Sequence, residues 1–160
     1  MNKLTIETVF HSYDEFSQLP LEIQKVMNSA IEARNNAYAP YSKFQVGAAV
    51  LLHDGTIVKG SNQENAAYPS GLCAERTAIF YVGANFPQHS IKAICISASS
   101  MLKDTTEPIP PCGACRQSLL EYENKQNEAI PVYFMGKSGE IMQSPSIKNL
   151  LPFIFKEDSL

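Results

Sequence analysis

Three of the four cysteines lie in two short motifs that could bind a metal ion. The first motif is Cys73-Ala74-Glu75, and the second is Pro111-Cys112-Gly113-Ala114-Cys115. In a protein expected to work in the cytosol, clustered cysteines indicate metal or redox chemistry more often than disulfides. Three thiolates without an obvious fourth protein ligand are typical of a catalytic zinc site, which keeps its open position for water. The motifs therefore predict one Zn²⁺ per chain, held by Cys73, Cys112 and Cys115.

Two other interpretations of these cysteines stay open at the level of the sequence. Cys112-x-x-Cys115 alone is also the spacing of a thioredoxin-like redox pair. A structural zinc site needs four closed ligands. The remaining cysteine and the histidines lie beside neither motif (Cys95, His11, His53 and His89). Cys95 is flanked by two isoleucines, so we expect a buried, inert thiol there.

Two charged residues, Glu75 and Arg76, lie in the first turn of the helix predicted after Cys73. A carboxylate there is ordinary, because the helix dipole favours it. Beside a catalytic metal, however, Glu75 is a natural base for moving protons. A non-ligand glutamate two residues after the first ligand, together with P-C-x-x-C, is a signature of zinc deaminases, although Cys73 stands here where that signature has histidine.

Arg76 is expected to tune the charge of the metal site. Three thiolates and Zn²⁺ together carry one excess negative charge. This charge would raise the pKa of the metal-bound water and so make the water harder to ionise. A guanidinium can donate hydrogen bonds to ligand sulfurs and draw off that charge. The alternative for Arg76 is an ordinary surface arginine on a helix.

The hydrophobic pattern predicts the elements that must bring the two motifs together. Helices are expected from residue 21 to Pro40, at 74–84 and at 113–123, strands at 45–52, 56–60, 91–98, 131–135 and 140–143, and a last helical turn at 146–151. This order gives an α/β fold, a sheet with helices packed on it. Right-handed crossovers place the two motif helices on one face with their N-termini at the same edge. Cys73 and Cys112 open these helices, so their sulfurs should converge.

Composition and charge limit the classes of protein that this chain can be. Its 160 residues suffice for one domain, and 44% are apolar, as in ordinary globular proteins. The net charge is −3 without a basic cluster, so neither nucleic acid polymers nor a membrane is an expected partner. The start lacks the apolar core of a signal peptide. We expect a cytoplasmic protein in which an extension at 1–20, an edge strand or an irregular arm, precedes one catalytic domain at 21–160.

Four segments of the chain closely resemble the small cytidine deaminases. They are Tyr41–Ala49, Asn62–Tyr68, Cys73–Ala78 and Pro111–Gln117, in the order and spacing of that family. Cysteine at position 73 is the pattern of the family's small, homotetrameric class. The resemblance implies a three-layer α-β-α fold, in which a mixed five-stranded sheet carries helices on both faces.

The resemblance also implies an activity. This is the zinc-dependent hydrolytic deamination of cytidine and 2′-deoxycytidine to uridine and 2′-deoxyuridine, which releases ammonia and serves pyrimidine salvage. Glu75 would be the catalytic residue that takes a proton from water and delivers it to the pyrimidine N3 and to the departing amino group. The alternatives are a zinc deaminase of another aminopyrimidine such as blasticidin S, and a non-enzymatic zinc or thiol module.

The family's pattern further implies where a nucleoside would bind. The implied substrate-binding residues are Phe44, Asn62, Glu64, Ala74 and Phe155. Phe44 would pack against the pyrimidine, while Asn62 and Glu64 would hold the ribose, where a carboxylate disfavours a nearby phosphate and hence cytidylates. Phe155 lies where the family places an aromatic ring that reaches a neighbouring subunit, which implies a homotetramer with composite active sites. Leu150 and Leu151 are expected to pack on their own sheet.

Overall fold

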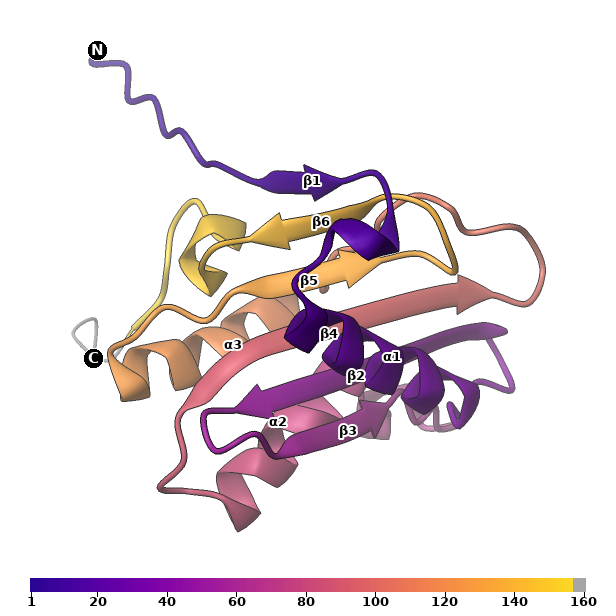
Figure 1. The fold of residues 1–160 in the computed structure, drawn as a ribbon. Helices are drawn as coiled ribbons and strands as arrows, with labels where there is room; N and C mark the ends of the chain where they lie inside the picture. Colours follow the sequence, from indigo (N-terminus) through magenta and orange to yellow (C-terminus); the bar gives the residue numbers. More distant parts are fainter. Residues whose placement is uncertain (157–160) are drawn as a thin grey trace.

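A mixed β-sheet forms the centre of the molecule (Figure 1). The computed structural model describes residues 1–156, so that 157–160, the end of the expected domain, lie outside the described residues. Within the described part, six strands follow the order β1-β6-β5-β4-β2-β3, where β4 and β5 are parallel and the other neighbours antiparallel. The strands are β1 His11–Tyr13, β2 Phe44–Leu52, β3 Ile57–Ser61, β4 Ile91–Ser100, β5 Val132–Met135 and β6 Ile141–Ser144, and the α-helices are α1 Leu21–Asn35, α2 Ala74–Asn85 and α3 Gly113–Gln126.

Helices cover both faces of this sheet. In Figure 1, α1 lies in front of the strands, and α2 and α3 lie behind them. The side chains of β2 alternate between the two resulting cores: Ala48 and Val50 face the core beneath α2 and α3, whereas Ala49 and Leu51 face the core beneath α1. A strand buried on both faces needs such a continuous apolar run. The expected three-layer α-β-α fold is confirmed, with six strands instead of five.

The sixth strand comes from the N-terminal extension. β1 pairs antiparallel with β6, and the hydroxyl of Tyr13 donates a hydrogen bond to Oε1 of Gln143 at 2.8 Å. Phe10 packs against the core beneath α2 and α3, and Thr8 and Val9 are hydrogen-bonded to Asn149. Residues 1–7 run away from the sheet without regular structure (Figure 1). The extension is therefore an edge strand near its end and an irregular arm at its start.

Helix α1 ends at Asn35, earlier than the end at Pro40 that the sequence predicted. The reason is a competing pairing, because the N–H of Tyr38 donates to the carbonyl of Asn62 at 3.0 Å and the N–H of Glu64 donates to the carbonyl of Tyr38 at 2.9 Å. The segment after the helix is thereby held beside the loop that follows β3. These two segments form one wall of the cleft described below.

The helices α2 and α3 begin directly after the cysteines that the sequence predicted to open them. Cys73 is the N-cap residue of α2, and Cys112 is the N-cap residue of α3. The last helical turn is a 3₁₀ helix at Ile147–Leu150. No helix among residues 1–156 is both long enough and apolar enough to cross a lipid bilayer.

Candidate active site

Three cysteine sulfurs converge where α2 and α3 begin. Cys73 and Cys112 cap the two helices, and Cys115 lies in the first turn of α3. All three sulfurs lie within 4.8 Å of one another. In a tetrahedral site with Zn–S bonds of about 2.3 Å, neighbouring sulfurs are about 3.8 Å apart, so this spacing fits Zn²⁺. Within residues 1–156, no other group of three or more cysteine, histidine or acidic side chains comes together in this way.

The protonation of these thiols also favours a bound cation. The pKa of Cys73 is lowered to about 5, first because the Cys115 thiol donates a hydrogen bond to it and next because the Arg76 guanidinium lies beside it. The same hydrogen bond, together with burial and the charge of Glu75, raises the pKa of Cys115. A thiol that loses its proton easily, as that of Cys73 does, is the form in which a cysteine binds a metal ion. The positive ends of two helix dipoles assist.

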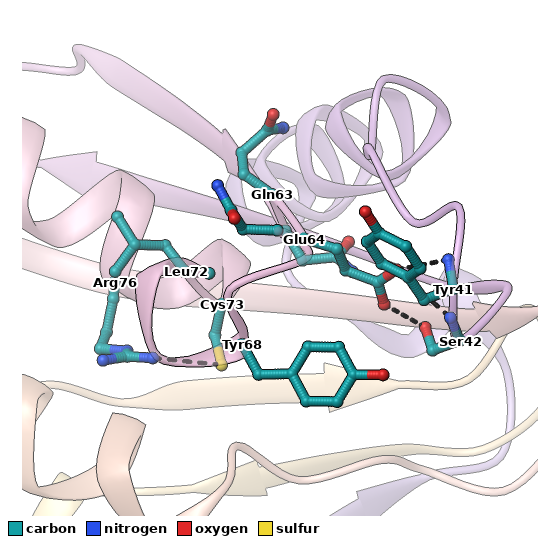
Figure 2. Close-up of a pocket in the computed structure, with 11 residues that line it drawn as sticks. Tyr41, Ser42, Gln63, Glu64, Tyr68, Leu72, Cys73 and Arg76 are labelled. Carbon is teal, nitrogen blue, oxygen red and sulfur yellow. Dashed lines mark hydrogen bonds between the residues drawn. The ribbon is translucent and has the colours of Figure 1, made fainter.

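Arg76, the third residue after the N-cap Cys73, lies against this cluster. Figure 2 shows its guanidinium beside Cys73, with Nη2 3.9 Å from Sγ. The thiolate of Cys73 raises the pKa of Arg76. Among the described residues, the buried Nε of Arg76 has no hydrogen-bond partner, which costs free energy unless an acceptor is supplied. Fully deprotonated sulfurs are such acceptors, so this orphaned donor also fits a metal-loaded cluster.

Glu75 is buried at the same helix start. Its side chain is only 5% exposed, and burial, followed by the charge of Cys73, raises its pKa above the ordinary range of a glutamate. A carboxyl group whose pKa is raised in this way can serve as both acceptor and donor of a proton. Ala74, one residue earlier, is fully buried. The site therefore places a buried carboxyl group beside a metal-binding donor set.

An open cleft of about 560 Å³ leads to Cys73 and Arg76. Glu64 lies in this cleft and accepts hydrogen bonds from the backbone N–H groups of Tyr41 and Ser42, at 2.9 and 3.2 Å, and from the Ser42 hydroxyl. Figure 2 shows these bonds on the side of the cleft opposite Arg76. The Ser42 hydroxyl is the main cause of the lowered pKa of Glu64. Hydrogen bonds from Tyr41 and Ser42 therefore fix a negatively charged carboxylate on the side of the cleft that lies away from Arg76.

Asn62 also lines the cleft, where its amide binds the backbone of β2. Its Nδ2 donates to the carbonyl of Phe44 at 2.9 Å, and its Oδ1 accepts from the N–H of Val46 at 2.8 Å. One N–H and one lone pair of the amide remain for a ligand. Phe44 is half-buried at the first position of β2. Asn62 thus ties the segment after β3 to the first residues of β2.

Two tyrosines in the cleft were not singled out from the sequence. The rings of Tyr41 and Tyr68 lie 6.3 Å apart between centroids, and in Figure 2 the ring of Tyr68 extends from beside Cys73 toward Tyr41. Both side chains are largely exposed, although large aromatic rings usually bury their faces. Both lie at the ends of segments that carry the family resemblance, but their proximity depends on two loops that meet only in the folded chain.

Phe155 does not reach the cleft of its own chain. Its ring is exposed, and its carbonyl accepts a hydrogen bond from Nε2 of Gln117 at 3.0 Å. Leu150 is buried and Leu151 packs beside it against the chain's own core, as expected. Cys95 is fully buried beneath α1, where burial raises its pKa, and it lies outside the sulfur cluster.

The sequence matches one family model over residues 21–128, more than half of the chain. That model describes the zinc-binding region of cytidine and deoxycytidylate deaminases. The chain belongs to this family. The match covers every cysteine of the cluster together with Glu75 and Arg76. Zn²⁺ is therefore the cofactor of this chain, and its deaminase family disfavours a non-enzymatic zinc or thiol module.

Similar members of the family align with nearly their whole length. A cytidine deaminase of Sporosarcina psychrophila is 41% identical over 140 residues, which cover 88% of this chain and 96% of the relative. A cytidine deaminase of Halalkalibacterium halodurans is 40% identical over 140 residues, 88% of this chain and 98% of the relative. The crystal structure of cytidine deaminase from Burkholderia pseudomallei superposes with a TM-score of 0.70 at 36% identity, covering 82% of this chain and 97% of that one.

Proposed function

We propose that this protein hydrolyses cytidine and 2′-deoxycytidine to uridine and 2′-deoxyuridine with release of ammonia. The observation that carries the proposal is a buried carboxyl group, Glu75, on the same helix turn as a three-sulfur cluster. Cys73, Cys112 and Cys115 would hold one Zn²⁺. When bound, the ion acts as a Lewis acid that brings a water molecule toward ionisation near neutral pH.

Glu75 would carry protons in both halves of the reaction. Its carboxylate takes the proton of the attacking water and delivers it to N3 of the pyrimidine, which makes C4 electrophilic. Oxygen then bonds to C4 as a hydroxyl group. Glu75 takes the remaining proton of that hydroxyl and transfers it to the amino group, which leaves as ammonia when the C4–N bond breaks and the C4 carbonyl forms. The raised pKa of this buried carboxyl group suits a residue that must hold and release a proton.

Four residues of the same chain would hold the nucleoside. Phe44 would pack against the pyrimidine, with Ala74 behind it, and Asn62 and Glu64 would hydrogen-bond the ribose. Glu64 is ionised, because the Ser42 hydroxyl lowers its pKa. Such a carboxylate accepts hydrogen bonds from sugar hydroxyls and repels a phosphate. Free nucleosides are therefore the proposed substrates, and cytidylates are not.

Spectrophotometric turnover of a substrate panel tests this function. The panel holds cytidine, 2′-deoxycytidine, cytidine monophosphate, cytosine and adenosine. We expect turnover of both free nucleosides and at least tenfold slower turnover of the nucleotide, since about 1.4 kcal/mol of charge repulsion gives a factor of ten. Equal turnover of cytidine and its monophosphate would remove Glu64 as the group that excludes phosphate, and no turnover of either nucleoside would refute the activity.

The proposal extends to a homotetramer with composite active sites. The exposed ring of Phe155, which lies outside its own cleft, is free to cover the pyrimidine bound by a neighbouring chain. Light scattering should give close to four times the chain mass of 17.7 kDa. Phe155→Ala should raise KM for cytidine while zinc stays bound, and Phe153→Ala, the loss of another exposed ring, should not. A fully active monomer would contradict composite sites.

Pyrimidine salvage in the cytoplasm is the proposed setting of this reaction. All four cysteines are free thiols, and thiolate ligands need a reducing compartment to remain so. Growth of a strain that depends on cytidine as its pyrimidine source, with and without this gene, tests the role in salvage. If the enzyme deaminates cytidine in vitro but its gene does not restore growth, the role in salvage is contradicted.

A further inference from the structure

Arg34 is a buried cation that the proposed reaction does not use. It lies in the last turn of α1 and is only 8% exposed. Its Nη1 donates to the hydroxyl of Ser97 at 2.8 Å, and that hydroxyl donates to the carbonyl of Gly136 at 3.0 Å. Burial lowers the pKa of the guanidinium. Among residues 1–156, no carboxylate forms an ion pair with Arg34.

Arg34 differs from the other buried charged groups of the described chain in how few groups offset its charge, since its side chain makes one hydrogen bond, to Ser97. Glu75 belongs to the active site, and Glu123 accepts hydrogen bonds from the N–H groups of Ile130 and Ile147, both at 2.8 Å, and from the Ser146 hydroxyl at 2.6 Å. The carbonyl end of α1 offers Arg34 only about half an elementary charge. Burying a cation without an opposite charge beside it costs free energy of folding. An anion bound at this position would therefore stabilise the folded state.

A cavity of about 610 Å³ opens onto Arg34 and carries further positive charge. It shares no lining residue with the active-site cleft. The lining includes Lys103 and Lys137 and a single carboxylate, Asp104, which leaves a formal charge of +2 on a chain whose net charge is −3. The hydroxyl of Ser100, which accepts from the N–H of Leu102 at 3.1 Å, keeps its own proton for a ligand.

We propose that this cavity is a second ligand site, which binds a phosphate-type oxyanion. The guanidinium of Arg34 forms its base, because a planar fork of donors matches the oxygens of a phosphate. Lys103 and Lys137 supply further charge at its rim, and the Ser100 hydroxyl supplies a donor. The bound group is inorganic phosphate or the phosphate of a nucleotide. The site is independent of the proposed deaminase reaction.

Thermal unfolding of the zinc-loaded protein at constant ionic strength tests this site. Uridine at saturating concentration fills the active-site cleft, and inorganic phosphate replaces chloride stepwise. We expect a saturable rise of Tm, because a ligand that binds the folded state alone stabilises it. In Lys103→Gln/Lys137→Gln, the phosphate Kd should rise at least about tenfold, because two charge-assisted contacts to the anion are lost. Lys3→Gln/Lys25→Gln removes the same charge from exposed positions outside the cavity and should bind phosphate as the parent does.

Arg34 itself gives the second arm of the test. Arg34→Gln should abolish the saturable rise, while Arg34→Lys, which keeps the charge, should retain a weaker one. Titration with uridine 5′-monophosphate in place of inorganic phosphate shows which of the two anions the site prefers. If the site binds nucleotides, the monophosphate has the lower Kd. An unchanged Kd in Lys103→Gln/Lys137→Gln would overturn the proposal. The proposal would also be overturned if neither inorganic phosphate nor uridine 5′-monophosphate gave a saturable rise of Tm. The counter-charge of Arg34 would then have to be a carboxylate from a second copy of the chain.

Discussion

The guanidinium of Arg116 holds the peptide that precedes Cys112, because its Nε donates to the carbonyl of Pro111 at 2.8 Å. The Nη1 of the same side chain donates to the carbonyl of Leu150 at 3.0 Å. Arg116 directly follows Cys115, so one side chain joins the two ends of the P-C-x-x-C motif and ties them to the C-terminal segment. This bond positions a predicted zinc ligand without touching the metal.

Arg116→Gln should therefore weaken zinc binding. Loss of groups that orient metal ligands typically lowers metal affinity by about 10–100-fold. Arg116→Lys should lie between the parent and Arg116→Gln, since a single ammonium group cannot reproduce the planar fork. Competition with a chromogenic chelator measures the affinity, with Lys125→Gln as the control on the same helix. Equal zinc affinity in Arg116→Gln and the control would exclude this positioning role.

Replacing any ligand cysteine by alanine should empty the metal site. The parent protein is expected to hold about one zinc per chain, and Cys73→Ala, Cys112→Ala and Cys115→Ala should each fall close to zero after dialysis. Cys95→Ala removes a thiol that is buried elsewhere and should keep its zinc. Elemental analysis of the four variants decides the assignment, which full occupancy in Cys112→Ala would contradict.

Glu75→Gln should keep the fold and the zinc but lose catalysis. Removal of a general acid–base group costs about 10²–10⁴ in rate, and one carboxyl group here serves several proton transfers. Glu121→Gln, at an exposed position of α3, is the matched control for the loss of a carboxylate. If Glu75→Gln deaminates cytidine at the rate of the control, the proton must travel by another group.

Arg76→Gln should shift the pH dependence of the reaction as well as its rate. The guanidinium lowers the pKa of both Cys73 and Glu75, so its removal raises both. Because Glu75 must be ionised to accept a proton, the acidic limb of the kcat/KM profile should move to higher pH. We expect activity to fall about 10–100-fold with zinc retained. An unchanged pH profile and an unchanged rate would mean that Arg76 does not tune the charge of the metal site and is an ordinary surface arginine.

Local patterns in the sequence were enough to predict most helices and strands and the chemistry of the site. The starts of α2 and α3 follow from Cys73 and Cys112 as cap positions, and the continuous apolar runs of β2 and β4 depend only on neighbouring residues. The same locality explains one error, because the helix pattern could not show that Tyr38 pairs with Asn62 and ends α1 early. The sixth strand was likewise undecided, since β1 is defined only by its pairing with β6.

The amino-acid sequence by itself determined the donor set, because residue types and short spacings such as Cys73-x-Glu75 and Cys112-x-x-Cys115 are written in it directly. The tertiary structure alone decided which groups face one another: three sulfurs within 4.8 Å, Asn62 bonded to Phe44, and Arg34 buried on Ser97 without a carboxylate. Such contacts join residues far apart along the chain. They arise from the packing of α1, α2 and α3 on the sheet, where burial and a low local dielectric set the strength of every charge.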